Sequence, residues 1–374
     1  MNRPRRAFLR RALVGSVLVV AVSAAGLVVL EGVSSALLFV RELFRSGAPG
    51  EIAEARHTRY DALLGWVNVP NTFLPDVYGP GLYVRINAQG FRANDDVPAH
   101  VPDGWTRAIC SGDSFTFGYG VDNEHTWCRM LQMDERRFTT VNMGLGGYGA
   151  DQSFLGYQRD AEQLGHQVHL FAFITLDFQR MAASDFMGYP KPTLALENGN
   201  LVVRGVPVPR RPFYAPWVAR FGPALRELRM THLAGRVAYR LGLGPGVAPE
   251  IPDDDIWAIA SAMFERLGDL NKARGSTLVL VYLPTQKDYA NTSVDAWRGR
   301  VKDLGTRTGI AVVDLVDEFR KLPPSKMTEM FIESSRLDYA KAAGHYTVAG
   351  NLWVAQQLAA RLAALPGVIS RTRP

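Results

Sequence analysis

The stretch SGDSFTFGYG, residues 111–120, decides how the sequence is interpreted. It follows a short apolar run that ends at Cys110, and glycines stand on both sides of Ser114. A serine that leaves the end of a buried strand in this way stands where a nucleophile would, at the carboxyl edge of a parallel sheet. Two questions follow: whether the chain forms such a sheet, and whether it supplies a base for the serine.

Short apolar segments alternate with amphipathic ones from residue 107 onward. The apolar segments predict five strands, at 107–111, 138–143, 168–174, 276–282 and 310–314. The segments between them predict helices, including one with Asp151 as its N-cap and one that is closed by Gly275. This order predicts an α/β fold, in which a parallel sheet has helices on both of its faces.

The first 40 residues predict a transmembrane helix, at 12–40. Residues 12–30 carry no charge, and as a helix they would be about 28 Å long, close to the thickness of the hydrocarbon core. Five arginines lie within residues 1–11, so the positive-inside rule places this tail in the cytoplasm and the main domain in the periplasm, across a bacterial inner membrane. The alternative is a cleaved signal peptide, with AVSA at 21–24 as its cleavage site.

Charge and cysteine content limit the partners and the compartment. The net charge is +6, of which the arginine-rich start supplies five, so about +1 remains for the rest and no nucleic-acid partner is expected. No cofactor and no metal ion are expected either. Cys110 and Cys128 lie in the exported part, where an oxidising compartment would permit a disulfide. Two separate small core residues are the alternative.

Four candidate functional positions fall at the carboxyl ends of the predicted strands. Ser114 follows the first strand, Gly147 the second and Asp177 the third, and His345 precedes the last helix. Histidine is the usual base for a serine nucleophile. The backbone N–H groups of Ser114 and Gly147 would then stabilise the oxyanion that forms on an ester or amide.

The sequences SGDSFTFGYGV, VNMGLGGYGADQ and GHYTVAGN resemble the SGNH/GDSL hydrolases, over about residues 105–365. YDALLGW and INAQGFR resemble the lead-in of envelope-anchored bacterial members. The resemblance implies a flavodoxin-like three-layer α/β/α fold with a five-stranded parallel sheet, and cofactor-free esterase or O-deacetylase chemistry. It also implies that Ser114 is the nucleophile with Asp113 beside it, that Gly147 is an oxyanion donor, and that His345 is the base.

Two positions depart from the pattern of that family. The third block normally reads Gly-Asn-Asp but here ends in Leu176-Asp177, so a side-chain donor is missing, which costs on the order of 10²–10³ in rate. The fourth block normally has an aspartate three residues before the histidine, where this chain has Ala342. Loss of that carboxylate can cost about 10⁴. Asp338 is the candidate substitute, with Glu333 a poorer one, and a solvated loop residue is the alternative for Asp338.

An Arg-rich insertion at about 183–250 interrupts the alternation, after an irregular lead-in at 41–104. Between residues 204 and 240 it has eight arginines, one acid and interleaved aromatic residues, which predicts either a surface excursion or a docking surface for lipid headgroups, an acidic glycan or a protein. With the two departures, this favours an accessory or scaffolding subunit of an integral membrane assembly, such as an energy-converting complex. The alternative is an active Ser–His esterase or O-deacetylase that acts on envelope glycans or lipids.

Overall fold

The computed structural model describes residues 3–46, 57–132, 137–186, 189–209, 253–333 and 342–365, together with Met230, Leu233 and Val237. The chain divides into two units. The anchor unit consists of Met1–Ala55 and Arg210–Pro249, and the sheet unit consists of Arg56–Pro209 and Glu250–Pro374.

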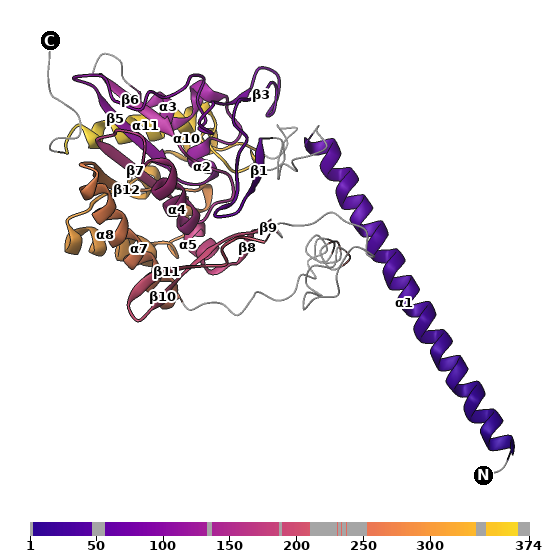
Figure 1. The fold of residues 1–374 in the computed structure, drawn as a ribbon. Coiled ribbons are helices and arrows are strands. Elements are labelled where there is room, and N and C mark those ends of the chain that lie inside the picture. Colours follow the sequence, from indigo (N-terminus) through magenta and orange to yellow (C-terminus); the bar gives the residue numbers. More distant parts are fainter. Residues whose placement is uncertain are drawn as a thin grey trace. The chain divides into compact units, whose positions relative to one another are not determined.

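Helix α1, Arg3–Ser46, belongs to the anchor unit (Figure 1). Its segment Leu13–Leu38 has a mean hydropathy of 2.6 and is long enough to cross a membrane, and a signal sequence has the same properties. The helix continues through Glu31, whose side chain is buried within this unit. One carboxylate oxygen of Glu31 accepts a hydrogen bond from the backbone N–H of Met230, at 2.6 Å.

The sheet unit is built on five parallel strands, and each of the five predicted strands is confirmed. They are β5 (Thr106–Ser111), β6 (Phe138–Asn142), β7 (Val168–Phe173), β12 (Thr277–Tyr282) and β13 (Ala311–Asp314). They lie in the order β13-β12-β7-β5-β6, with every neighbouring pair parallel. Numbered along the chain from the other edge, this is the order 2-1-3-4-5 of flavodoxin-like sheets.

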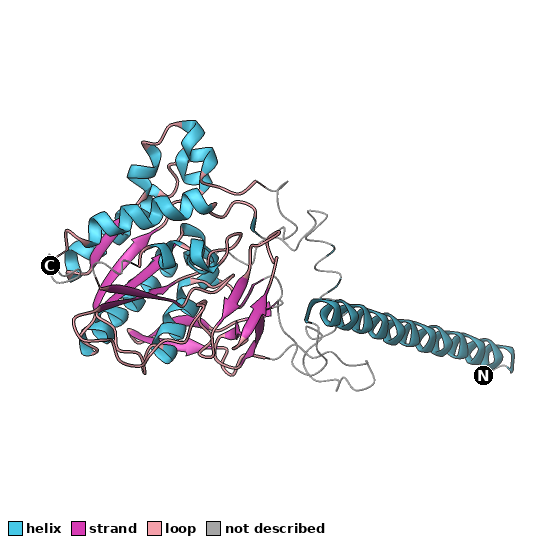
Figure 2. Cartoon of the chain, turned by 90° about the horizontal axis from the view of Figure 1, so that it is seen from above, coloured by secondary structure: helices cyan, strands magenta, loops and turns pink. Residues whose placement is uncertain are grey.

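Side chains of the strands alternate between two buried cores, as a sheet covered on both faces requires. Ile109 and Phe171 point into one core and Cys110 and Leu170 into the other. The first core is closed by α4 (Ala150–Asp160), α5 (Thr175–Ala182), α7 (Asp253–Ala273) and α8 (Asp295–Thr308). The second is closed by α3 (Trp127–Met130), α9 (Val316–Arg320), α10 (Pro324–Glu329) and α11 (Val348–Leu362). Helices accordingly lie on both sides of the strands (Figure 2), which confirms the three-layer α/β/α fold.

Two predicted helices differ from the structure in detail. The N-cap of α4 is Gly149 rather than Asp151, because Asp151 lies in the first turn and its carboxylate binds Lys191 Nζ at 2.6 Å, with both side chains fully buried. Between the first two strands, where a helix was expected, residues 124–131 are split between a 3-10 turn, Asn123–His125, and the short α3. The cause is Thr126, which keeps an extended backbone and caps α3.

Small hairpins organise the segments on either side of the central pattern. In the lead-in, β1 (Thr58–Asp61) pairs with β2 (Gly65–Asn68) and β3 (Thr72–Leu74) pairs with β4 (Val84–Ile86). In the insertion, β8 (Asp185–Phe186) pairs with β9 (Tyr189–Pro190) and β10 (Thr193–Glu197) pairs with β11 (Asn200–Arg204). Nearly all of the predicted docking surface, which begins at Arg204, lies outside the described residues.

Cys110 and Cys128 form a disulfide, which decides between the two alternatives that the sequence left open. The bond joins β5 to α3, with 6.2 Å between the two Cα atoms, and both residues are fully buried. It therefore fixes the strand that carries Ser114 to the helical layer beside it.

Candidate active site

The turn after β5 presents Ser114 at the carboxyl edge of the sheet. Gly112 makes this turn possible, because a Cβ atom there would lie 2.5 Å from the carbonyl oxygen of Ala172. Asp113 then caps the short helix α2, Ser114–Phe117, by accepting a hydrogen bond from the N–H of Phe115 at 2.8 Å. Ser114 is therefore the first residue of α2 and its position is fixed by the backbone around it.

The structure brings Ser114 and His345 together, as the sequence predicted. Ser114 Oγ lies 2.7 Å from His345 Nε2, which is hydrogen-bonding distance. On the other side of the ring, Nδ1 lies 3.2 Å from the carbonyl oxygen of Ala342. A carbonyl can only accept, so Nδ1 carries the proton and Nε2 is free to accept from the serine hydroxyl.

The expectation that Ala342 leaves the imidazole without an orienting group is therefore wrong. Its methyl group cannot do so, but its backbone carbonyl does. The sequence pattern shows only the missing carboxylate, because a backbone acceptor is present at every residue and its direction depends on the loop conformation.

The environment of His345 favours the neutral, basic form of the ring. Burial lowers the pKa of His345 below its ordinary value, and the negative charge of Asp113 opposes part of that change. The rings of Phe115 and Tyr119 flank the imidazole, with centroids 4.7 and 5.3 Å away. The neutral ring, which can accept a proton, therefore persists to a lower pH than in an exposed histidine.

Gly147 occupies the position predicted for an oxyanion donor, in the loop after β6. Its φ is +80°, and a Cβ atom there would lie 2.6 Å from the ring of Phe186, so the loop requires glycine on both counts. Within the described part of the chain, the N–H groups of Ser114 and Gly147 do not donate to any internal acceptor.

Arg180 connects these segments and was not identified from the sequence. Its Nη1 donates to Asp113 Oδ2 at 3.1 Å, to the carbonyl of Tyr148 at 3.0 Å and to Asp177 Oδ1 at 2.7 Å. It thus ties the turn of Ser114 to the loop of Gly147. The spacing Asp177-x-x-Arg180, three residues apart on one helix, was the sequence signal that could have revealed it.

Asp177 binds Arg180 and the backbone, and among the described residues its side chain bonds to neither member of the Ser114–His345 pair. Its second oxygen accepts from the N–H of Ile174 at 3.0 Å. Burial and the neighbouring charge of Asp113 raise the pKa of Asp177, while Arg180 lowers it in part. Asp177 and Asp113 are therefore positioning residues that share one arginine.

The remaining candidates give a mixed result. Leu176 is 45% exposed in the first turn of α5 and carries no donor, and the hydroxyl of Thr175 is engaged with Tyr282, at 2.7 Å. The loss of a third oxyanion donor stays a prediction. Asp338 lies outside the described residues. The described residues include no group of three or more His, Cys, Asp or Glu side chains that could hold a metal ion.

A second Ser–His pair includes the last residue of β5, Ser111. Ser111 Oγ is 2.6 Å from His169 Nε2, and both residues are fully buried. The side-chain nitrogen of Asn271 lies 3.1 Å from His169 Nδ1 and donates to the carbonyl of Leu267 at 2.8 Å. Burial lowers the pKa of His169 well below its ordinary value.

No protein-family model and no curated protein matches this sequence. Solved structures that are similar include a putative lipolytic protein of the G-D-S-L family from Desulfitobacterium hafniense DCB-2, with 13% identity and a TM-score of 0.35 over 68% of this chain and 98% of that chain. A lipase/acylhydrolase from Enterococcus faecalis has 10% identity and a TM-score of 0.41, over 72% and 100%. A member of the lipolytic G-D-S-L family from Veillonella parvula DSM 2008 has 13% identity and a TM-score of 0.38, over 70% and 100%.

Two of these neighbours are described by name as members of the G-D-S-L family. The chain's own five-stranded parallel sheet is the one that the resemblance to SGNH/GDSL hydrolases predicted. At such low identity the neighbours do not assign an activity, which has to be argued from the residues of this chain.

Proposed function

We propose that the chain is a membrane-anchored serine ester hydrolase in which Ser114 and His345 act as a catalytic dyad. The observation that carries the proposal is the 2.7 Å distance between Ser114 Oγ and His345 Nε2, with the proton on Nδ1 directed to the carbonyl of Ala342. Serine becomes nucleophilic when such a base is within hydrogen-bond reach and is itself held by a third group.

In this mechanism Nε2 takes the hydroxyl proton as Ser114 Oγ attacks the ester carbonyl carbon. The oxyanion is held by the N–H groups of Ser114 and Gly147. His345 then gives the proton to the leaving alcohol, and the C–O bond of the ester breaks. A water molecule, deprotonated by the same histidine, hydrolyses the acyl-serine and releases the acid. The proposed substrates are acyl esters on envelope glycans or lipids.

The geometry also suggests a slow enzyme. In a serine triad, most of the cost of losing the orienting carboxylate comes from the wrong tautomer of the histidine. The carbonyl of Ala342 secures the right tautomer, so this cost is avoided, although its partial charge stabilises the imidazolium less than a carboxylate would. Leu176 supplies no donor, which lowers the rate by on the order of 10²–10³.

The competing proposal is a non-catalytic accessory or scaffolding subunit of a membrane assembly. It is supported by Leu176, which leaves the oxyanion site with fewer donors and is itself exposed. Both proposals include a single-pass anchor at Leu13–Leu38 and an exported sheet unit, and the disulfide supports export because such bonds persist in oxidising compartments.

The test uses the full chain in nanodiscs, with 4-nitrophenyl acetate as substrate and a fluorophosphonate as active-site probe. We expect slow turnover and labelling of Ser114, and neither in Ser114→Ala or His345→Ala. Absence of both turnover and labelling in the unmodified chain, with membrane proteins copurifying in fixed stoichiometry, would instead favour the accessory subunit.

A further inference from the structure

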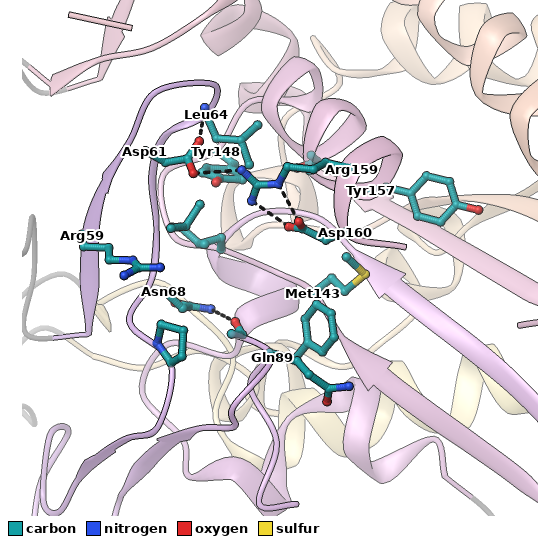
Figure 3. Close-up of a pocket in the computed structure, with 17 residues that line it drawn as sticks. Arg59, Asp61, Leu64, Asn68, Gln89, Met143, Tyr148, Tyr157, Arg159 and Asp160 are labelled. Atoms are coloured by element: carbon teal, nitrogen blue, oxygen red, sulfur yellow. Dashed lines mark hydrogen bonds and ion pairs between the residues drawn. The ribbon is translucent and has the colours of Figure 1, made fainter. Parts of the chain in front are cut away.

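A cavity of about 230 Å³ lies between the lead-in hairpins and helix α4 (Figure 3). Its walls come from β1, β2, the turn around Gln89, the loop after β6 and the outer face of α4. Neither Ser114 nor His345 lines it, so it is distinct from the dyad. Its volume is below the ~300 Å³ at which pockets for drug-sized ligands begin, and it suits one small ring.

Asn68, in the wall of this cavity, has an unsatisfied acceptor. The residue is 5% exposed, and its Nδ2 donates to the carbonyl of Gly90 at 2.9 Å. Its Oδ1 is buried and has no hydrogen-bond partner within the described part of the chain. A buried acceptor without a hydrogen bond destabilises the fold. A ligand with an O–H or N–H group would satisfy it. The hydroxyl of Ser153 belongs to the same wall.

The charges that line the cavity balance one another. Arg159 donates to Asp61 at 2.9 Å and, through two of its nitrogens, to Asp160 at 2.6 and 2.9 Å. Asp61 also accepts the N–H groups of Leu63 and Leu64. Figure 3 shows Arg159 held between the two carboxylates, with Arg59 on the opposite side of the space. Two arginines and two aspartates favour a ligand without net charge.

The wall also has an apolar part. Phe91, Met143 and Leu145 face the space together with Pro70 and Tyr148. A ligand for this cavity therefore presents hydroxyl groups on its edge and a C–H surface on its face. Among neutral molecules with one ring, a sugar has this combination.

We propose that this cavity binds a single neutral sugar unit of a glycan. A sugar hydroxyl donates to Asn68 Oδ1, and the C–H face of the ring packs on Phe91 and Met143. The site is independent of the proposed hydrolase, because a binding module with an inactive Ser114 would use it equally. A lone sugar of this size is expected to bind with a dissociation constant on the order of 1 mM.

The test is saturation-transfer NMR on the full chain in nanodiscs, with the methyl glycosides of glucose, galactose, mannose and N-acetylglucosamine as probes. We expect saturable transfer to at least one of them, and the same transfer with Ser114→Ala. That second measurement separates this proposal from the hydrolase, since loss of catalysis leaves sugar binding unchanged.

Gly156 supplies a matched pair of variants. A Cβ atom there would lie 3.7 Å from Leu64 and 3.9 Å from Tyr148, which is ordinary contact, so Gly156→Ala is expected to fold and to bind. Gly156→Leu extends a side chain into the cavity and is expected to abolish transfer. If Gly156→Leu fails to fold, Ser153→Ala replaces it, with an expected loss in affinity of about 3–10-fold from one hydrogen bond.

Three outcomes would overturn the proposal. No saturable transfer to any neutral glycoside would show that the cavity holds water only. Transfer to methyl glucuronide alone would show that Arg59 and Arg159 select an anion, contrary to the charge balance. Transfer that is unaffected by both Gly156→Leu and Ser153→Ala would place the sugar elsewhere on the chain.

Discussion

The end of β5 has two Ser–His pairs that differ in what they can do. Ser111–His169 and Ser114–His345 have nearly equal contact distances, 2.6 and 2.7 Å. They differ at the far ring nitrogen. His169 Nδ1 faces the amide nitrogen of Asn271, a donor, whereas His345 Nδ1 faces the carbonyl of Ala342, an acceptor.

This difference reverses the direction of the hydrogen bond between serine and histidine. Nδ1 of His169 must be unprotonated, because it faces a donor. Its Nε2 therefore carries the hydrogen and donates to Ser111. His345 carries its hydrogen on Nδ1, so Nε2 is the base that accepts from Ser114. A short Ser–His distance therefore does not identify a nucleophile; the partner of the second ring nitrogen does.

The largest effect is expected from removing the two serines in turn. Ser114→Ala should reduce ester hydrolysis to the background rate, a loss of at least about 100-fold, because it removes the attacking atom. Ser111→Ala should retain the rate within about threefold. Initial rates with 4-nitrophenyl acetate measure both, and equal losses would show that the two pairs are not functionally distinct.

Changing the partner of His169 should affect stability and leave catalysis intact. Asn271→Asp places an acceptor and a buried charge at Nδ1 and removes the donor to Leu267, so the free energy of unfolding should fall by about 2–4 kcal/mol. Urea denaturation measures the change, with the exposed Asp269→Asn on the same helix as control. An unchanged free energy of unfolding would contradict the assignment of Asn271 as the donor to His169 Nδ1.

Supplying the family's carboxylate at Ala342 should also destabilise the protein. Its methyl group is fully buried in an apolar cluster with Tyr78, Val84, Ile86 and Phe117. Ala342→Asp would place a carboxylate there without solvent, so we expect a loss of about 1–3 kcal/mol. Thermal unfolding against Ala342→Ser, which is smaller and uncharged, is the measurement. Unchanged stability together with faster hydrolysis would show that the carboxylate reaches His345.

Restoring the missing donor is expected to have a moderate and favourable effect. Leu176 is 45% exposed, so Leu176→Asn costs little stability and returns an amide to the first turn of α5. We expect hydrolysis to rise about 10–100-fold, below the full value of an oxyanion donor. Leu176→Ala, which removes the same side chain without adding a donor, should show no rise.

The smallest effect concerns the pH dependence. Hydrolysis needs neutral His345, and burial lowers its pKa below the ordinary value of about 6.5. Activity should therefore persist below pH 6.5 and be lost only as pH falls through the lowered pKa. A profile of kcat/KM against pH checks this, and an acid limb centred above 6.5 would contradict it.

The sequence predicted the fold well because periodicity reports burial. The three central strands β5, β7 and β12 are buried along nearly their whole length, which a sheet covered on both faces demands. Ser114, Gly147 and His345 were found because they follow strands or precede a helix at one edge. Arg180 and Ala342 were missed, since their roles depend on where a long side chain folds back and on where a backbone carbonyl points.

Asp151 shows the same limit for local rules. An acidic residue near the start of a helix is a good N-cap candidate, but Lys191, 40 positions away, takes its carboxylate instead. Long-range ion pairs of this kind leave no trace in the spacing of neighbouring residues.

The disulfide has a consequence for biogenesis. It closes a ring of the chain between Cys110 and Cys128, 18 positions apart, and Ser114 lies inside this ring. In the loop-entropy description, closing a loop of this length raises the free energy of the unfolded chain by about 3 kcal/mol. During synthesis in a reducing cytosol the ring would stay open, and it would close only where thiols are oxidised. In the proposed topology, the turn that carries Ser114 would reach its final form only after the sheet unit has crossed the membrane.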